Sequence, residues 1–356
     1  MFVNFNFVKI IFSDIYVCAY FLIWEVSALL KKQYEKLEGG VWMIRSTIQN
    51  QKPTKMLTGK QKKYLKLLLL LFPFMAYVGL FSYFPLFGWS YAFLRFNPAL
   101  KISKMQFVGL DNFSALFRFT GALQTVLTNT FAISGLSLLT TVLPVIFAIL
   151  ISMVPSKKYA KFVQSVTTIP NFISWVLVYS LFFSLFAPES GVVNQLLIRL
   201  GLISVPTDPL GDVNNAWFVQ TGVGIWKNLG WGAIIYLAAI AGIDQELYES
   251  AAIDGANRFQ STIHITLPGL ANTYFVLLLL AISNILSNGF EQYWVFQNPM
   301  TVPKLEVFDT YVYRLAMVNN QYAFSTAMSI MRTIVSVTLL FSANRLSKRV
   351  RGESIV

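Results

Sequence analysis

Two cations lie inside long apolar stretches of the sequence, where a charge needs a specific reason to be present. Lys227 directly follows the run WFVQTGVGIW, and Arg332 lies in the apolar run after Tyr322. An unpaired charge at the centre of a bilayer costs about 3 kcal/mol or more, so both side chains should face protein or a water-filled path. We expect Lys227 to line a polar path or to extend its ammonium to the membrane surface. Arg332 lies deeper, and we expect it to line a path or to pair with an acid or carbonyl of a partner chain.

Other polar and aromatic side chains in these stretches could contact a hydroxyl-rich ligand such as a sugar. Aromatic rings stack on the C–H faces of sugars, and amides and carboxylates hydrogen-bond to their hydroxyl groups. The same residue types are also common at membrane surfaces and between helices, so they are candidates only. With the two cations, the substrate-path candidates are Asn171, Trp175, Tyr179, Trp226, Lys227, Asn228, Trp231, Asn284, Asn288, Glu291 and Arg332.

The sequence has few of the residues that a metal site, a disulfide or a catalytic site would need. The chain has one histidine, His264, and one cysteine, Cys18, too few for a His/Cys metal cluster or an intrachain disulfide. Acids are not clustered inside the apolar stretches either. We therefore predict neither catalytic residues nor a metal site in this chain.

The composition places most of the chain in a membrane. Of 356 residues, 55% are hydrophobic and 12% are charged, whereas about a quarter of an ordinary soluble domain is charged. Such a chain cannot cover its surface with polar groups. This excludes a soluble enzyme, a disordered scaffold and a nucleic-acid-binding domain, in spite of the net charge of +12.

Six apolar stretches have the length of about 20 residues that a membrane-spanning helix needs. They are too long and too uniformly apolar for the alternating strands of a barrel. The sequence therefore predicts an all-α integral membrane protein with six spans, near residues 66–93, 122–152, 164–187, 217–242, 269–290 and 321–343.

Positive charge predicts the orientation, because cytoplasmic segments are rich in Lys and Arg. The segment before the first span has eleven such residues, the 153–163 loop has three, and Arg345, Lys348, Arg349 and Arg351 follow the last span. Six spans place all three segments, and hence the C-terminus, in the cytoplasm. The 243–268 loop falls on the same side, yet it has only Arg258 against four acids.

The 243–268 loop has the pattern of two short helices separated by a break. Gly255 can take the left-handed conformation that ends the first helix, and Asn257 can cap the second. Phe259, Ile263 and Leu267 then recur at a spacing of four and form one apolar stripe. Two short helices with an acidic edge and small alanines suit docking into a groove of a cytosolic protein; the alternative is an ordinary amphipathic loop.

The domain organisation that we expect is a basic N-terminal extension (1–60), a six-span domain (61–350) and a short tail (351–356). The run between Asp14 and Glu25 is too short to span a membrane. We expect it to form an interfacial helix or a dispensable extension. The alternatives are a seventh span and a working protein that begins at Met43 or Met56.

The loop carries a recognisable pattern. Glu249, Ala251, Gly255, Ile265, Leu267 and Pro268 match E-x-A-x3-G-x9-I-x-L-P, which resembles the coupling loop, or EAA motif, of permease subunits in binding-protein-dependent ABC importers. Ser250 stands where the family usually has alanine, and Gln245 where one subgroup often has proline.

The resemblance extends over about residues 62–348. Segments such as IPNFISWV (169–176), IWKNLGWGAIIYLAAIAGID (225–244) and FEQYWVFQNP (290–299) are similar to maltose-type carbohydrate-uptake permeases. The segment FDTYVYR (308–314) resembles the subgroup that handles oligo- and polysaccharide fragments.

This resemblance implies a type I ABC importer transmembrane domain in a bacterial cell membrane. It implies a second homologous permease subunit, two copies of a cytosolic ATPase and an external solute-binding protein that delivers an oligosaccharide. The chain has no G-x-x-x-x-G-K-[ST] motif, so ATP and Mg²⁺ are expected on the ATPase subunits. The residues expected to contact the ATPase are Glu246, Glu249, Ala251, Ala252, Gly255, Ile265, Leu267 and Pro268.

The sequence is also compatible with two other functions. The same architecture can import another solute, such as an amino acid or a peptide. A secondary transporter could instead couple Lys227 or Arg332 to an ion, although acids that relay protons are nearly absent from the predicted spans.

Overall fold

A computed structural model describes residues 59–98, 100–101, 104–118 and 121–351. Contacts divide the chain into two units, Met1–Tyr77 and Val78–Val356, which are described separately. The described part of the first unit, residues 59–77, belongs to helix α2 (Gly59–Val78). The expected interfacial helix between Asp14 and Glu25 lies outside the described residues.

The second unit is built almost entirely from helices, with one isolated antiparallel bridge between Leu94 and Phe107 in its described part. Its longer helices are α4 (Gly121–Thr140), α5 (Val142–Ser152), α6 (Lys157–Thr168), α7 (Trp175–Phe186), α9 (Ala216–Ala241), α12 (Leu267–Ser283) and α16 (Tyr322–Arg351). The shorter α-helices are α3 (Asp111–Leu116), α8 (Val192–Arg199), α10 (Gln245–Ile253), α11 (Arg258–Ser261), α13 (Phe290–Phe296), α14 (Val302–Leu305) and α15 (Phe308–Tyr313). The 3₁₀- and π-helical segments are η1 (Gly79–Tyr83), η2 (Phe84–Phe93), η4 (Ile169–Phe172), η5 (Thr262–Thr266) and η6 (Arg314–Val318).

The helices confirm the all-α prediction and most of the predicted spans. Five helical stretches in the described residues are long and apolar enough to cross a membrane, and a bent pair makes six if it is counted as one span. The five stretches are Lys66–Phe93, Gly121–Ser152, Ala216–Ala241, Arg258–Ser283 and Tyr322–Arg349.

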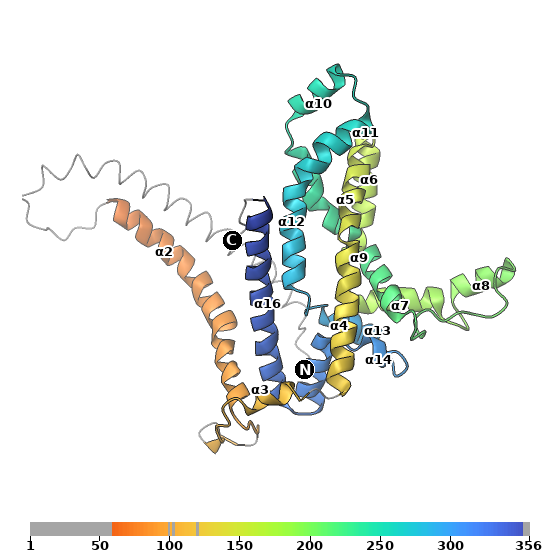
Figure 1. The fold of residues 1–356 in the computed structure, drawn as a ribbon. Coiled ribbons are helices and arrows are strands. Elements are labelled where there is room, and N and C mark those ends of the chain that lie inside the picture. The colour runs from red at the N-terminus through yellow and green to blue at the C-terminus, as the bar shows by residue number, and fades with distance from the viewer. Residues whose placement is uncertain (1–58, 99, 102–103, 119–120, 352–356) are drawn as a thin grey trace, which may run out of the picture. The chain divides into compact units, whose positions relative to one another are not determined.

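The third span differs from the prediction of one continuous helix over 164–187. It consists of Lys157–Phe172 and Trp175–Phe186, which meet at an angle of 105° (Figure 1). Pro170 lies at the start of η4, and Ile173 has an extended backbone. The Ser174 hydroxyl then accepts a hydrogen bond from the backbone N–H of Leu177 and begins α7. The break follows from a proline that cannot donate to the helix and from a serine that starts a new one.

The fifth span is also shifted from its predicted range of 269–290. One helical stretch runs from Arg258 to Ser283, so the second helix of the 243–268 loop continues directly into the fifth candidate span. The backbone N–H of Leu267 donates to Thr262 O, five residues earlier, which makes η5 a π-helical turn. Pro268 follows in the first turn of α12. The wide turn carries the helix past a proline without ending it.

The helices pack around small apolar clusters. One cluster joins α5, α9 and α12 through buried Val145, Ala233 and Leu270. Another joins α4, α15 and α16 through Val126, Phe308 and Met328. Helices α12 and α16 also pack against each other, as Figure 1 shows in light and dark blue. Outside these clusters, polar side chains of α4 and α9 contact the 288–293 segment.

Candidate functional site

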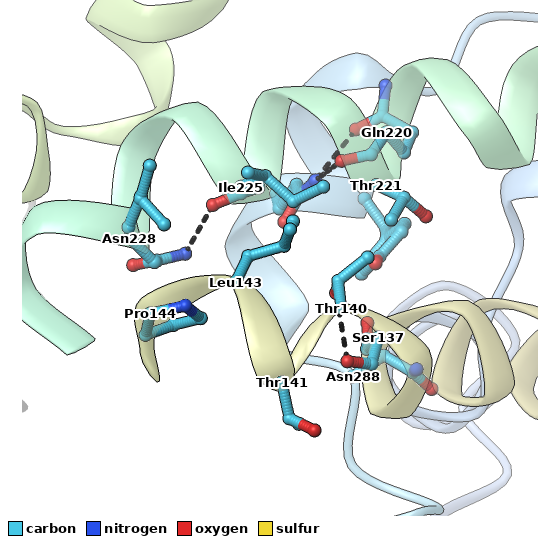
Figure 2. Close-up of a pocket in the computed structure, with 14 residues that line it drawn as sticks. Ser137, Thr140, Thr141, Leu143, Pro144, Gln220, Thr221, Ile225, Asn228 and Asn288 are labelled. Carbon is cyan, nitrogen blue, oxygen red and sulfur yellow. Dashed lines mark hydrogen bonds between the residues drawn. The ribbon is translucent and has the colours of Figure 1, made fainter. Parts of the chain in front are cut away.

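A cavity of about 290 Å³ lies between α4, α5, α9 and the 288–293 segment (Figure 2). None of its fourteen lining residues is charged. The lining residues with a side-chain hydroxyl or amide are Ser137, Thr140, Thr141, Gln220, Thr221, Asn228, Asn288, Gln292 and Tyr293. Burial raises the pKa of the Tyr293 phenol, so this group also stays neutral. The cavity therefore offers neutral hydrogen-bonding groups together with apolar side chains.

One wall of the cavity is the irregular junction between α4 and α5. The Thr140 hydroxyl donates to Ser137 O at 2.9 Å, and the Thr141 hydroxyl donates to Leu138 O at 2.7 Å. Each hydroxyl thus bonds to a backbone carbonyl one turn earlier, near the end of α4. Hydroxyl oxygens with free lone pairs are thus held beside the cavity.

A pair of glutamines forms a second wall; neither was among the predicted substrate-path residues. The Gln292 side-chain amide donates to the backbone O of Gln220 at 2.9 Å and to its side-chain O at 3.0 Å, and both side chains are buried. The signal in the sequence was Gln220, an amide in the middle of an apolar run. Such a residue usually faces protein or a polar cavity.

Asn288 has the most distinctive hydrogen bonding in the cavity wall. Its Nδ2 donates to Ser134 Oγ at 2.7 Å, and the Ser134 hydroxyl donates to Ile285 O at 2.5 Å. The single hydroxyl hydrogen of Ser134 is already donated to Ile285 O, so Ser134 can only accept a hydrogen bond from Asn288. The atom of the Asn288 amide that faces Ser134 is therefore its nitrogen. The Asn288 Oδ1 is buried and has no hydrogen-bond partner among the described residues.

Asn228 is the other predicted path residue that lines this cavity. Its Nδ2 donates to Gly224 O, and its Oδ1 accepts from Asn171 Nδ2 at 2.9 Å. Asn171 itself does not line the cavity. Of the eleven predicted path residues, only Asn228 and Asn288 are in its lining.

Lys227 is held by the break in the third span. Its Nζ donates to the carbonyl oxygens of Pro170 at 3.0 Å, Asn171 at 2.8 Å and Ile173 at 2.5 Å. The residue is 5% exposed, and its ammonium lies 5.2 Å from the ring centroid of Trp175. Lys227 therefore does not extend to a membrane surface, which was one of the two expectations; it satisfies carbonyls that the helix break has released.

Arg332 has a partner in its own chain. It forms an ion pair with Asp309, whose other carboxylate oxygen accepts the backbone N–H of Gly289 at 3.2 Å. The expected pairing with an acid or carbonyl of a partner chain stays a prediction; within this chain, α15 brings Asp309 against α16. A second ion pair, between Arg314 and Glu306 at 2.5 Å, raises the pKa of the guanidinium.

The remaining predicted path residues pack elsewhere. Tyr179 meets the ring of Phe296 with centroids 5.2 Å apart, Trp226 meets Phe182 at 5.4 Å, and Trp231 meets Phe172 at 5.7 Å. Asn284 lines a smaller cavity of about 230 Å³, which Asn288 also lines. Glu291 is half-buried in the first turn of α13.

The 243–268 loop has the local structure that the sequence predicts. Gly255 has a φ of +77°, and it ends α10 with its N–H donating to Ala252 O. The Asn257 side chain accepts from the N–H of Gln260 at 2.9 Å, and the Gln260 side chain accepts from the N–H of Asn257 at 2.8 Å. This is a reciprocal cap at the start of α11.

The outer surface of this loop is apolar and acidic. Ile253 is 86% exposed, and Phe259 is 68% exposed. Glu246 and Glu249 are exposed, and neither has an ion-pair partner in the described part of the chain. Of the other residues expected to contact an ATPase, Ala252, Gly255, Leu267 and Pro268 are exposed, whereas Ala251 and Ile265 are half-buried.

The loop is also attached to the membrane helices. The Tyr248 hydroxyl lies 2.9 Å from Thr266 Oγ1 and joins α10 to η5. Arg258 donates to Met153 O, directly after α5, at 3.4 Å. A movement of the loop would therefore reach both α5 and α12.

Comparison with known proteins identifies the family. The sequence profile described as "Binding-protein-dependent transport system inner membrane component" matches residues 141–352. The chain belongs to this family. It is therefore an inner membrane component of a transport system, as the resemblance in the loop implied.

Individual relatives are similar in sequence to this permease over most of its length. It is 36% identical over 299 residues to Protein LplB of Bacillus subtilis (strain 168), covering 83% of this chain and 92% of the relative. It is 37% identical over 298 residues to the polygalacturonan/rhamnogalacturonan transport system permease protein YteP of the same organism, covering 83% and 91%.

A solved structure confirms the predicted type of transmembrane domain. The permease matches a chain of a bacterial ABC transporter involved in the import of the acidic polysaccharide alginate, with a TM-score of 0.74 and 35% identity. The match covers 82% of this chain and 97% of that one.

Proposed function

We propose that this permease forms one side of the path through which an ATP-driven importer moves oligosaccharides. The observation that carries this proposal is the uncharged, hydroxyl- and amide-lined cavity between α4, α9 and the 288–293 segment. Neutral groups that both donate and accept hydrogen bonds suit the hydroxyls of a sugar. Its volume of about 290 Å³ is close to the lower end of small-molecule sites, about 300 Å³, which fits a path that a second subunit completes.

The same cavity argues against the other solutes considered. A free amino acid or peptide carries a cationic amino terminus, and burying a cation requires a partner of opposite sign. The cavity lining offers none, because it has no Asp or Glu. A proton-coupled transporter would also need a group in the cavity that titrates near neutral pH, and the lining has no Asp, Glu or His.

The relatives support a carbohydrate substrate. Besides the polygalacturonan/rhamnogalacturonan permease, they include a diacetylchitobiose uptake permease of Streptomyces coelicolor and an arabinooligosaccharide permease of Bacillus subtilis. The alginate transporter has also been solved in complex with an alginate pentasaccharide-bound periplasmic protein. An external binding protein that delivers the oligosaccharide is therefore part of the proposal.

The 243–268 loop is the proposed docking site for a cytosolic ATPase. Exposed Ile253 and Phe259 offer apolar contact area, and Glu246 and Glu249 offer unpaired negative charge. We place this loop and the C-terminus in the cytoplasm. The complete importer would contain a second homologous permease and two ATPase copies, which bind ATP and Mg²⁺; this chain contributes no catalytic group.

Uptake by the reconstituted importer tests the proposal. The permease, purified with its partner subunits, would be placed in liposomes that contain ATP and Mg²⁺, with the binding protein and a labelled oligosaccharide outside. Uptake that requires both ATP and the binding protein is the expected result. Uptake that follows an ion gradient without ATP would overturn the proposal, as would ATP-dependent uptake of amino acids or peptides in place of oligosaccharides.

A further inference from the structure

Asp309 connects a membrane helix to the segment that forms one wall of the cavity. One of its carboxylate oxygens pairs with Arg332 of α16, and the other accepts the backbone N–H of Gly289 at 3.2 Å. The Asp309 side chain is 13% exposed. A buried carboxylate is stable when its charge is paired and its remaining lone pairs accept hydrogen bonds, and this one meets both conditions.

Gly289 directly follows Asn288 in the cavity wall. Two hydrogen bonds thus hold Asn288 in place: its own Nδ2 donates to Ser134, and the N–H of the next residue, Gly289, donates to Asp309. Both anchors belong to helices that pack against each other, since α4 and α15 share an apolar cluster. The turn at 288–289 is therefore tied to the rigid part of the bundle.

This arrangement leaves one acceptor unused. The Asn288 Oδ1 is buried without a partner among the described residues, while Asn288 lines both the larger and the smaller cavity. A buried acceptor without a donor costs about 1–3 kcal/mol. A small rotation of the amide that exposes this oxygen to a cavity would let a ligand hydroxyl supply the missing donor and recover this energy.

We propose that Asp309, held by Arg332, is a positioning residue that fixes the 288–289 turn so that Asn288 Oδ1 accepts a hydroxyl group of the transported oligosaccharide. This inference rests on the proposed function. Asp309 itself does not line the cavity, so its effect on the substrate passes through the Gly289 N–H.

Two double variants separate the ion pair from the hydrogen bond to Gly289. In Asp309→Asn with Arg332→Gln, both charges are removed, but the amide oxygen at 309 can still accept from Gly289. In Asp309→Arg with Arg332→Asp, both charges remain, but position 309 has no acceptor. The measured quantities are the KM for oligosaccharide uptake, the maximal rate and the amount of permease in the membrane.

The neutral variant should keep a KM within about twofold of the original. The reversed variant should raise the KM about five- to tenfold, which corresponds to the loss of one hydrogen bond. If the reversed pair lowers the amount of permease, Asp309→Leu with Arg332→Gln provides a second comparison. It differs from the neutral variant only in lacking an acceptor at 309, and it should raise the KM in the same way.

The Glu306–Arg314 pair is a matched control. It lies in the same 302–318 segment, and neither residue lines the cavity. Reversing it with Glu306→Arg and Arg314→Glu should alter the amount of permease more than the KM.

The outcomes distinguish a failure of the positioning role from a failure of the proposed function. Equal KM values for variants with and without an acceptor at 309, in an importer that works, would overturn the positioning role alone. An original importer that takes up no oligosaccharide would reject the proposed function and this inference with it.

Discussion

The ammonium of Lys227 lies 2.5 Å from the carbonyl oxygen of Ile173, although the two residues are separated by 54 positions in the chain. Two further carbonyls of the same break, those of Pro170 and Asn171, also accept from this nitrogen. A cation beside the free carbonyls at the end of a helix is electrostatically favourable. Lys227 thus replaces the backbone donors that the broken third span lacks.

Lys227→Met should therefore destabilise the permease strongly. The change leaves the carbonyls of Asn171 and Ile173 without a donor in an apolar region, whereas Pro170 O keeps the backbone N–H of Ile173. Each carbonyl without a donor costs about 1–3 kcal/mol; we expect a loss of about 2 kcal/mol or more, measured as a lower Tm of the purified complex in detergent. Lys304→Met is the control, because the Lys304 ammonium lies over Trp217 at 4.2 Å and this contact is worth about 1 kcal/mol. Equal effects of the two changes would contradict the role of Lys227.

Gly230→Ala should prevent α9 from packing against the end of α6. A Cβ at position 230 would lie 2.3 Å from Thr167 O and 2.7 Å from Thr168 N, both backbone atoms. We expect a cost of about 1–3 kcal/mol from overpacking, again measured as a lower Tm. Gly222→Ala in the same helix is the matched control, since a Cβ there meets nothing within 4 Å. A tolerated Gly230→Ala would show that the two helices can separate at little cost.

Gly255→Val should abolish uptake while the permease remains in the membrane. A β-branched residue at a φ of +77° is strained by about 1–3 kcal/mol, which would distort the end of α10 in the proposed ATPase-docking loop. Gly255→Asn tests the cause, because asparagine tolerates this conformation and should retain most of the uptake. Uptake assays and membrane immunoblots would be compared; normal transport by the valine variant would reject the coupling function of the loop.

Glu249→Lys should weaken the binding of the ATPase without changing the fold. Glu249 is exposed and unpaired among the described residues, so its reversal affects a partner more than this chain. The measurement is the amount of ATPase that co-purifies at several salt concentrations. Glu189→Lys, an exposed acid in the 187–215 segment between the third and fourth spans, should leave co-purification unchanged. An equal loss in both variants would argue against an acidic contact at Glu249.

Much of the local structure was predictable because it depends on neighbours in the sequence. Apolar length predicts the spans, and the types of residues 255 and 257 predict a helix end and a helix cap, which the φ of Gly255 and the Asn257–Gln260 hydrogen bonds confirm. The bend at Ile173 was missed. The local signal for it was Pro170, but prolines also occur in continuous membrane helices when neighbouring groups satisfy the backbone.

The pairings between distant residues were not predictable from spacing. Nothing in the sequence indicates that Gln292 meets Gln220, or that Asp309 rather than another chain neutralises Arg332. These contacts depend on how α9, α13, α15 and α16 pack, and a polar side chain in an apolar run indicates only that some partner exists. The sequence therefore indicated which residues need a polar partner, whereas the packing of the helices determines the identity of each partner.

The continuous helical stretch from Arg258 to Ser283 makes the proposed docking loop and the fifth span one mechanical part. Its 26 residues correspond to a rod of about 39 Å. A tilt of about 10° imposed at one end would displace the other end by about 7 Å for a rod of this length. A small rotation of the proposed docking loop would thus become a displacement as wide as a sugar ring at the far end of the fifth span, and the α11–α12 rod would act as a lever.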